Sequence, residues 1–154
     1  MERFWKFAPW VSRLILLPPT TIFCLIALRY ITSPVASAAA QGIAFSSPLG
    51  VTIGRVGLGG FPLGSALFLA TCLASSRRTL IGLTFVAILV SVVLVVRVVG
   101  MTIDSSVAEN MNLVKAEIGL LVVTGIGLLI EFRRRSRLTP SSSRAAGFAG
   151  PSGK

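Results

Sequence analysis

The stretch TLIGLTFVAILVSVVLVVRVVGM, which runs from Thr79 to Met101, contains one charged side chain, Arg97. A helix of this length rises about 35 Å at ~1.5 Å per residue, which is enough to cross the ~30 Å hydrocarbon core of a bilayer. A long apolar run with so few charges is typical of a transmembrane helix. The stretch therefore predicts a membrane protein, in which Arg97 must lie near an interface, pair with an acid or serve a function.

The composition of the whole chain supports this interpretation. Hydrophobic residues make up 53% of the chain and charged residues 13%, whereas an ordinary soluble domain is about 25% charged. The 154 residues can form a bundle of a few spans and leave no room among them for a large soluble catalytic domain. We therefore expect an all-α membrane protein built as a four-transmembrane-helix bundle.

The chain divides into four spans and the segments around them. The expected spans are about residues 14–32, 56–75, 79–101 and 113–132. The other segments are a basic, aromatic cytoplasmic flank (1–13), an outer loop with a short interfacial helix (33–54) and a basic tail (133–154). The tail is rich in Ser, Pro and Gly, a composition that cannot build a core, so we expect it to be disordered.

Three local patterns refine this division. Pro18-Pro19 should kink the first span or mark its start, since proline disrupts a helix interior. The turn around Arg77-Arg78 is only a few residues long, so the second and third spans should be antiparallel neighbours. An A-x-A-like site at residues 36–38 leaves signal-peptide cleavage as an alternative, although Arg29 interrupts the apolar core that precedes it.

The distribution of basic residues predicts the orientation. Eleven of the fifteen basic residues lie in the first flank, in the turn between the second and third spans and in the tail. By the positive-inside rule, both termini of this multi-pass protein should be cytoplasmic, in the inner (plasma) membrane of the cell. The basic tail is then expected to contact anionic lipids, which accounts for the net charge of +10 without nucleic acid.

The sequence contains no pattern of a cofactor site or a catalytic centre. It has no histidine, and Cys24 and Cys72 lie in separate apolar spans, as small buried residues do. Two such cysteines support neither a disulfide framework nor a metal site. No acid and base are placed as a catalytic pair, so we expect no enzyme and no cofactor.

Ionisable residues of the spans gather in one outer layer. Arg97 lies about 27 Å from Thr79 along a helix, close to the outer edge of the hydrocarbon core, and Glu117 lies about 22 Å from Phe132. The expected cluster comprises Arg29, Arg55, Arg97, Asp104 and Glu117. It can be a set of ion pairs that snorkel to the headgroups, an electropositive outer pocket for an anion, or part of a proton or ion path.

Small residues predict which spans pack most closely. Gly60 and Gly64 form a small-xxx-small pair beside Gly59, and the fourth span carries Gly119. Such residues let helix backbones approach each other closely in membranes. We therefore expect the second and fourth spans to make the tight contact, and the same motif leaves a homo-oligomer as an alternative use.

The order of several residues resembles that of a protein family. It runs Tyr30-x-x-x-Pro34, Gly42, Arg55-x-x-x-Gly59, Gly64, Arg97-x-x-Gly100-x-x-x-Asp104 and Glu117. This order is similar to that of a family of small bacterial four-span inner-membrane proteins, classed as a domain of unknown function, and the likeness covers about residues 14–132. In the third span Val96, Gly100 and Ser105 stand where the family has Gly, Ser and Gly. The resemblance implies a bacterial origin, four spans and an outer polar cluster, and it implies no reaction.

Two functions fit these patterns. We expect a structural or accessory membrane protein, whose partners are the lipid bilayer and another membrane protein or a second copy of the chain. The alternative is a small binding protein or carrier for an amphipathic anion such as a lipid headgroup or a quinone. A stable complex with another membrane protein would favour the first function, and a bound anion would favour the second.

Overall fold

The computed structural model describes residues 2–138, and this part of the chain contains helices and turns but no strand. Its elements in chain order are α1 (Glu2–Thr32), α2 (Pro34–Ala39), α3 (Pro48–Gly54), the π-helix η1 (Arg55–Gly60), α4 (Phe61–Leu73), α5 (Thr79–Ile103) and α6 (Val107–Leu138). The segments long and apolar enough to cross a membrane are Trp10–Thr32, Pro48–Leu73, Thr79–Ile103 and Asn110–Ser136. The predicted all-α architecture with four such helices is therefore confirmed.

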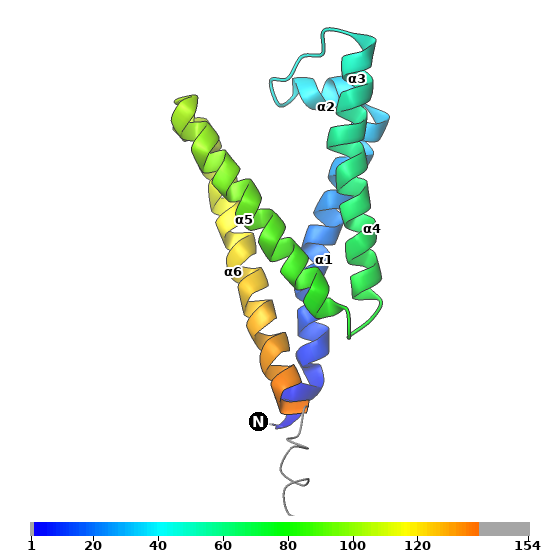
Figure 1. The fold of residues 1–154 in the computed structure, drawn as a ribbon, viewed down its shortest axis with the longest axis vertical. Helices are drawn as coiled ribbons and strands as arrows, with labels where there is room; N and C mark the ends of the chain where they lie inside the picture. Colours follow the sequence, from blue (N-terminus) through cyan, green and yellow to red (C-terminus); the bar gives the residue numbers. More distant parts are fainter. Residues whose placement is uncertain (1, 139–154) are drawn as a thin grey trace, which may run out of the picture.

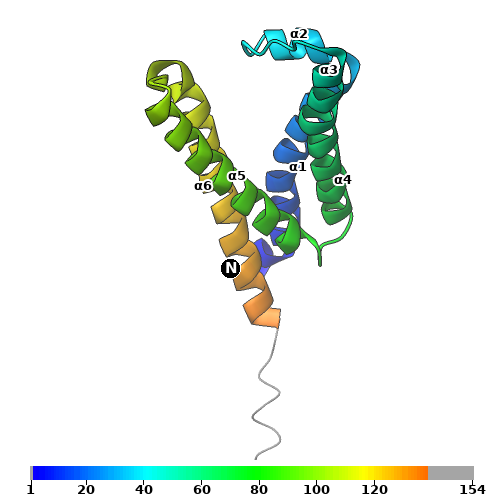
Figure 2. The same cartoon turned by 45° about the horizontal axis from the view of Figure 1, so that its top comes forward.

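The long helices form two arms (Figure 1). In one arm α1 packs along η1 and α4, and in the other arm α5 packs along α6. The arms meet at the end that holds Glu2, Leu138 and the α4–α5 turn, which we call the terminal end. They diverge toward the end that holds α2, α3 and the α5–α6 turn, which we call the loop end, and Figure 2 shows the same divergence from another direction.

An apolar core joins the arms in the terminal half. Its buried residues come from α1, α4 and α5, and they are Leu16, Leu69, Cys72, Leu83, Val86 and Val90. Gly82 allows α5 to lie against the other arm, because a Cβ placed on it would lie 2.8 Å from Cys72 Cβ in α4 and 2.8 Å from Leu16 Cδ2 in α1. A larger side chain at residue 82 would therefore force the arms apart at their junction.

The opening between the arms can be followed along one side of α5. Gly100 comes about five helical turns, or ~27 Å, after Gly82, so the two glycines lie on the same side of the helix. At Gly82 this side touches α1 and α4, whereas a Cβ placed on Gly100 would meet no atom within 4 Å. The same side of α5 is thus buried between the arms near the terminal end and open near the loop end.

Helix α1 is continuous through Pro18 and Pro19, so neither proline marks its start. The described part of the predicted 1–13 flank belongs to this helix as well. Each proline lacks the N–H that would bond a carbonyl one turn earlier, a loss that membrane helices tolerate when neighbouring groups supply contacts. Here Pro19 is fully buried, so packing around it supports the helix at this point.

The second span begins at Pro48, earlier than the predicted residue 56. Ser47 caps this helix, because its Oγ accepts a hydrogen bond from the Gly50 N–H at 3.1 Å, and Pro48 suits the first helical turn. Helices α3, η1 and α4 then follow one another without a break. The predicted loop over residues 33–54 is correspondingly shorter, and α2 is the short helix expected within it.

Helix α6 extends the predicted fourth span at both ends. Residues 133–138, which belong to the predicted disordered tail, are helical. The prediction is wrong there because Arg134 and Arg135 bond a buried carboxylate one turn earlier in α6, that of Glu131. The rest of the predicted tail, residues 139–154, lies outside the described residues.

Helices α4 and α5 are neighbours only beside the turn that joins them. Beyond it they diverge, and each packs along a different helix, α4 on α1 and α5 on α6. The short connection therefore predicts their antiparallel direction correctly, but it does not predict which helix each one packs against.

Candidate functional site

The polar group at the loop end of the α5–α6 arm consists of Arg97, Asn110 and Glu117. Arg97 Nε and Nη2 each lie 2.8 Å from Glu117 Oε1, so the predicted pair between the third and fourth spans is present. Arg97 Nη1 donates to Asn110 Oδ1 at 3.2 Å. The side chains of Arg97 and Glu117 are 26% and 15% exposed, so the pair is largely shielded. Arg97 is accommodated in α5 because it faces an acid and an amide on α6.

The α5–α6 turn positions the asparagine of this group. Ser105 in the turn has a φ of 53°, in the left-handed region that glycine adopts most easily. Asn110 Nδ2 donates to the Ser106 carbonyl at 3.1 Å and to Ser106 Oγ at 3.2 Å, which leaves its Oδ1 for Arg97.

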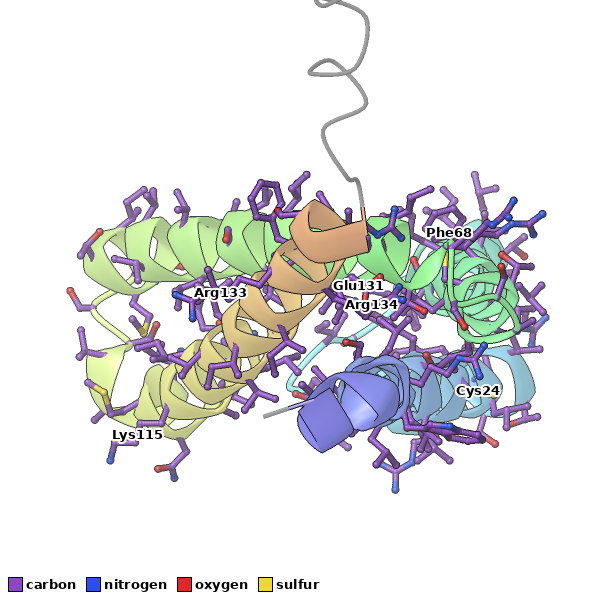
Figure 3. The ribbon with its side chains drawn as sticks, turned by 90° about the horizontal axis from the view of Figure 1, so that it is seen from below. Cys24, Phe68, Lys115, Glu131, Arg133 and Arg134 are labelled. Atoms are coloured by element: carbon purple, nitrogen blue, oxygen red, sulfur yellow. The ribbon has the colours of Figure 1, made fainter. Side chains whose placement is uncertain are left out.

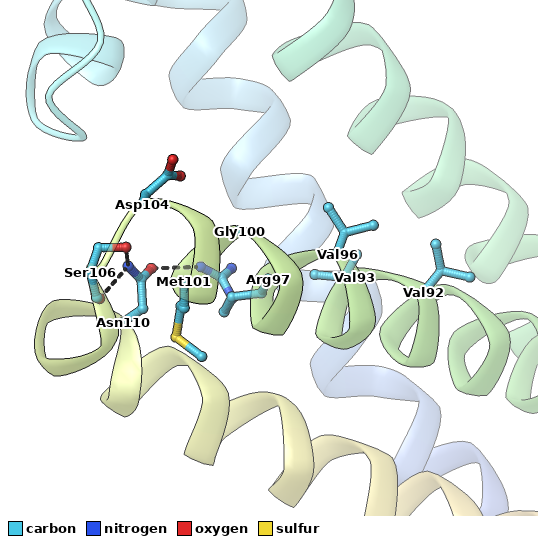
Figure 4. Close-up of a pocket in the computed structure, with 9 residues that line it drawn as sticks. All are labelled: Val92, Val93, Val96, Arg97, Gly100, Met101, Asp104, Ser106 and Asn110. Carbon is cyan, nitrogen blue, oxygen red and sulfur yellow. Dashed lines mark hydrogen bonds between the residues drawn. The ribbon is translucent and has the colours of Figure 1, made fainter.

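A cavity of about 390 Å³ lies beside the polar group. Figure 4 shows its lining, which has an apolar part formed by Val92, Val93 and Val96 and a polar part that includes Arg97, Asp104 and Asn110. Gly100 also lines the cavity, and it lies on the side of α5 that faces the other arm. The cavity is therefore part of the opening between the arms.

The structure does not assemble the predicted outer cluster into one ring. Arg29 lies near the end of α1 and Arg55 begins η1, so both belong to the other arm. Both side chains are exposed, and neither forms an ion pair among the side chains that the structure describes. Arg29 lines a separate cavity of about 380 Å³ between α1 and α2. Arg97 and Glu117 are the paired members, Asp104 lines their cavity, and the divergence of the arms separates the other two.

The predicted packing of the glycines is also corrected. Gly59 makes a close approach, because a Cβ placed on it would lie 2.9 Å from Ile31 Cγ1, but this contact is with α1. A Cβ would meet no atom within 4 Å at the other predicted positions, Gly60, Gly64 and Gly119. The tight helix contacts are those of α1 with α4 and of α5 with α6, and the expected contact of the second span with the fourth is wrong. Gly82 and Gly127 make the other close approaches between helices.

A second polar group lies at the terminal end, centred on Glu131 of α6, and it is missing from the predicted cluster. Glu131 is fully buried; its Oε2 accepts a hydrogen bond from Arg134 Nε at 2.9 Å and its Oε1 accepts one from Arg135 Nε at 3.0 Å. Figure 3 shows Glu131 and Arg134 together between the helices, with Arg133 on another side of α6. The i,i+3 and i,i+4 spacing of an acid and two arginines is the sequence signal for this group.

The second polar group also fixes the α4–α5 turn. Arg135 Nη2 donates to the carbonyl of Arg77, and Arg13 Nη2 of α1 donates to Ser76 Oγ at 3.0 Å. The turn is thus bonded by α6 on one side and by α1 on the other. These bonds reinforce the junction of the arms that the apolar core forms.

The chemistry available at the two groups is hydrogen bonding. Among the side chains that the structure describes, no three of His, Cys, Asp or Glu are placed to hold a metal ion. At the loop end, Arg97 retains N–H groups beyond those that Glu117 and Asn110 accept, and it lines a cavity with an apolar wall. This arrangement suits a polar acceptor carried by an otherwise apolar partner.

The chain has no match among protein-family models, curated proteins or solved structures. The resemblance to the bacterial four-span family therefore stays a prediction from the order of residues. Function has to be argued from the geometry of the arms and of their polar groups.

Proposed function

We propose that this chain is a structural or accessory protein of the bacterial inner membrane, which binds a helix of another membrane protein in the opening between its arms. Both termini lie in the cytoplasm in this proposal, as the positive-inside rule favours for a chain with most of its basic residues at the terminal end. The opening then faces the outer half of the bilayer.

The open side of α5 supports this proposal. Val92 and Val96 on this side are 55% and 64% exposed, and Gly100 leaves space above the backbone. Transmembrane helices associate through close van der Waals contact, which small residues and complementary shapes favour. The open side of α5 is apolar and includes a glycine, and the junction of the arms keeps this side uncovered. It therefore has the surface that a further helix requires.

The unaccepted N–H groups of Arg97 favour a partner helix over a lipid acyl chain as the occupant of the opening. Its side chain is 26% exposed, and its guanidinium has N–H groups that no described side chain accepts. An acyl chain has no acceptor for them, and an unsatisfied donor in hydrocarbon is costly. A serine, asparagine or backbone carbonyl on a partner helix would satisfy them while the rest of that helix contacts the valines.

The alternative function, a carrier for an amphipathic anion, has less support from the geometry. An electropositive pocket requires several arginines around one space. Arg29 and Arg55 lie in the other arm, and Arg97 is already bonded by a carboxylate. The charge that was expected to attract an anion is therefore dispersed and partly neutralised.

Native mass spectrometry of the gently extracted protein tests the proposal. The wild-type chain should leave the membrane in a complex with another membrane protein. Val96→Trp should remove that partner, because the indole fills the opening. Val98→Trp is the matched control, since residue 98 comes two positions later and lies on nearly the opposite side of α5. It should keep the partner.

Three results would contradict the proposal. The wild-type chain could carry lipid and no protein partner, or Val96→Trp could keep the partner as well as Val98→Trp does. A complex of two copies of this chain would leave the opening as an interface. Its partner would then be a second copy of the chain and not another membrane protein.

A further inference from the structure

A further cavity, separate from the opening between the arms, lies between α5 and α6 in the terminal half. It has a volume of about 550 Å³ and is lined by Leu80, Thr84, Gly125, Leu128, Leu129 and Phe132. Leu80 comes two residues before Gly82, so it lies on nearly the opposite side of α5 from the side that contacts α1 and α4. We call this cavity the α5–α6 groove, and it faces away from the other arm.

The lining of the α5–α6 groove is suited to hydrocarbon. Five of its six lining residues are leucine, phenylalanine or glycine. The sixth is Thr84, whose hydroxyl donates to the Leu80 carbonyl of its own helix at 2.9 Å. A Cβ placed on Gly125 would meet no atom within 4 Å, so the groove is open above this residue. From Gly125 to Phe132 the groove extends along α6 for about 10 Å. This length matches a part of an acyl chain.

Unpaired arginines lie at the terminal end of the groove. Arg133 follows Leu129 by one helical turn, and Arg77 comes three residues before Leu80, in the turn beside the end of α6. The side chains of these two arginines are exposed, and neither side chain has a hydrogen bond or ion pair within the described part of the chain. Arg134, by contrast, is bonded to Glu131.

The position of these arginines is fixed relative to the groove. The carbonyl of Arg77 accepts a hydrogen bond from Arg135 Nη2, which holds the start of α5 beside the end of α6. Glu131 lies two residues before Arg133, so it lies toward a different side of α6 and does not neutralise it (Figure 3). A cationic rim therefore adjoins an apolar groove at the depth where α6 passes from apolar to basic residues.

We propose that the α5–α6 groove binds one anionic phospholipid, with an acyl chain against Gly125 and Leu129 and the phosphate on Arg133 and Arg77. Arginine binds phosphate through paired N–H groups, and basic side chains between helices at a membrane surface attract anionic headgroups. Zwitterionic phospholipid can fill the apolar part, but it gains less from the arginines because its headgroup has no net charge. The site therefore distinguishes headgroups by charge and uses the groove to hold the lipid in place.

The test is a titration of the full chain in detergent micelles with phosphatidylglycerol and, separately, with phosphatidylethanolamine, followed by native mass spectrometry. Arg77→Gln/Arg133→Gln should weaken phosphatidylglycerol binding by about tenfold or more. Binding of phosphatidylethanolamine should change little. Arg29→Gln/Arg55→Gln is the matched control, because it removes two exposed arginines from the loop end, and it should leave the binding of both lipids unchanged.

A pair of glycine variants tests the groove itself. Gly125→Leu should fill the groove and weaken the binding of both lipids several-fold. Gly119→Leu introduces the same side chain on the same helix at another open position outside the groove, and it should have no effect. If the arginine variant weakens binding but Gly125→Leu does not, lipid binds a charged surface and the groove site is wrong. If neither variant differs from its control, the chain has no anionic-lipid site here.

Discussion

Arg97 on α5 and Glu117 on α6 form an ion pair in which Arg97 Nε and Nη2 each lie 2.8 Å from Glu117 Oε1. The two residues belong to antiparallel helices joined by a short turn, so similar distances from that turn place them at the same height. The pair joins α5 to α6 near the loop end, where the other arm does not pack against them. It therefore stabilises the wall of the opening.

Arg97→Leu should lower the free energy of unfolding by about 2–4 kcal/mol, because it leaves the Glu117 carboxylate without its partner in a largely shielded position. Replacing both residues with leucine should recover much of this loss, since no charge is then left unpaired. Unfolding in mixed micelles, followed by circular dichroism, measures both effects. Arg29→Leu, at an exposed arginine of the other arm, should change stability by less than about 0.5 kcal/mol. Equal stabilities for Arg97→Leu and Arg29→Leu would show that the pair contributes nothing.

Ser105→Gly should stabilise the protein by about 0.5–1 kcal/mol. Ser105 has a φ of 53°, and a residue with a Cβ is strained in this conformation whereas glycine is not. The matched control is Ser105→Ala, which removes the hydroxyl but keeps the Cβ and should not stabilise. The same micelle unfolding experiment compares the two variants, and a greater gain from alanine than from glycine would rule out backbone strain as the cause.

Glu131→Leu should destabilise the terminal end by about 3 kcal/mol or more, because it leaves two arginines without their buried acceptor. Hydrogen exchange followed by mass spectrometry should then show faster exchange over residues 133–138. Asp104→Leu removes an exposed carboxylate from the opposite end and should leave this exchange unchanged. Slow exchange over residues 133–138 in Glu131→Leu would mean that the helix end does not depend on the ion pairs.

Alkaline phosphatase fusions test the proposed orientation. The enzyme should be inactive when fused after Lys154, because it stays in the reducing cytoplasm, and active when inserted near Ser105, in the α5–α6 turn. This expectation follows from the concentration of arginine and lysine at the terminal end. The reverse pattern of activity would place the terminal end outside the cytoplasm and would contradict the proposed orientation.

The long helices and one ion pair could be predicted from the sequence. Each apolar run is long enough to cross a bilayer, and a short connection makes the third and fourth spans antiparallel. Depth along two adjacent helices is then sufficient to bring Arg97 and Glu117 together. Depth in the membrane does not determine lateral position. The sequence therefore predicts Arg29 and Arg55 in the same ring as Arg97, whereas the divergence of the arms separates them from it.

The remaining differences arise from packing, which local patterns do not determine. Gly60 and Gly64 have the spacing of a packing motif, yet they face open space, whereas Gly82 lies at the junction without any motif around it. The predicted cluster does not include Glu131, because it contains only residues near the outer ends of the spans. Glu131 lies at the inner end of an apolar run, beside arginines that were assigned to the tail. Its burial depends on where α6 meets the α4–α5 turn, which is a property of the whole fold.

Photo-crosslinking in native membranes tests most directly whether the opening binds a partner helix. A photoreactive amino acid replaces Val96, on the open side of α5, in one sample, and Val98, on nearly the opposite side, in the other. A protein adduct of one defined mass is expected from position 96, and mainly lipid adducts are expected from position 98. Lipid adducts alone from both positions would show that acyl chains fill the opening, and would contradict the proposed function.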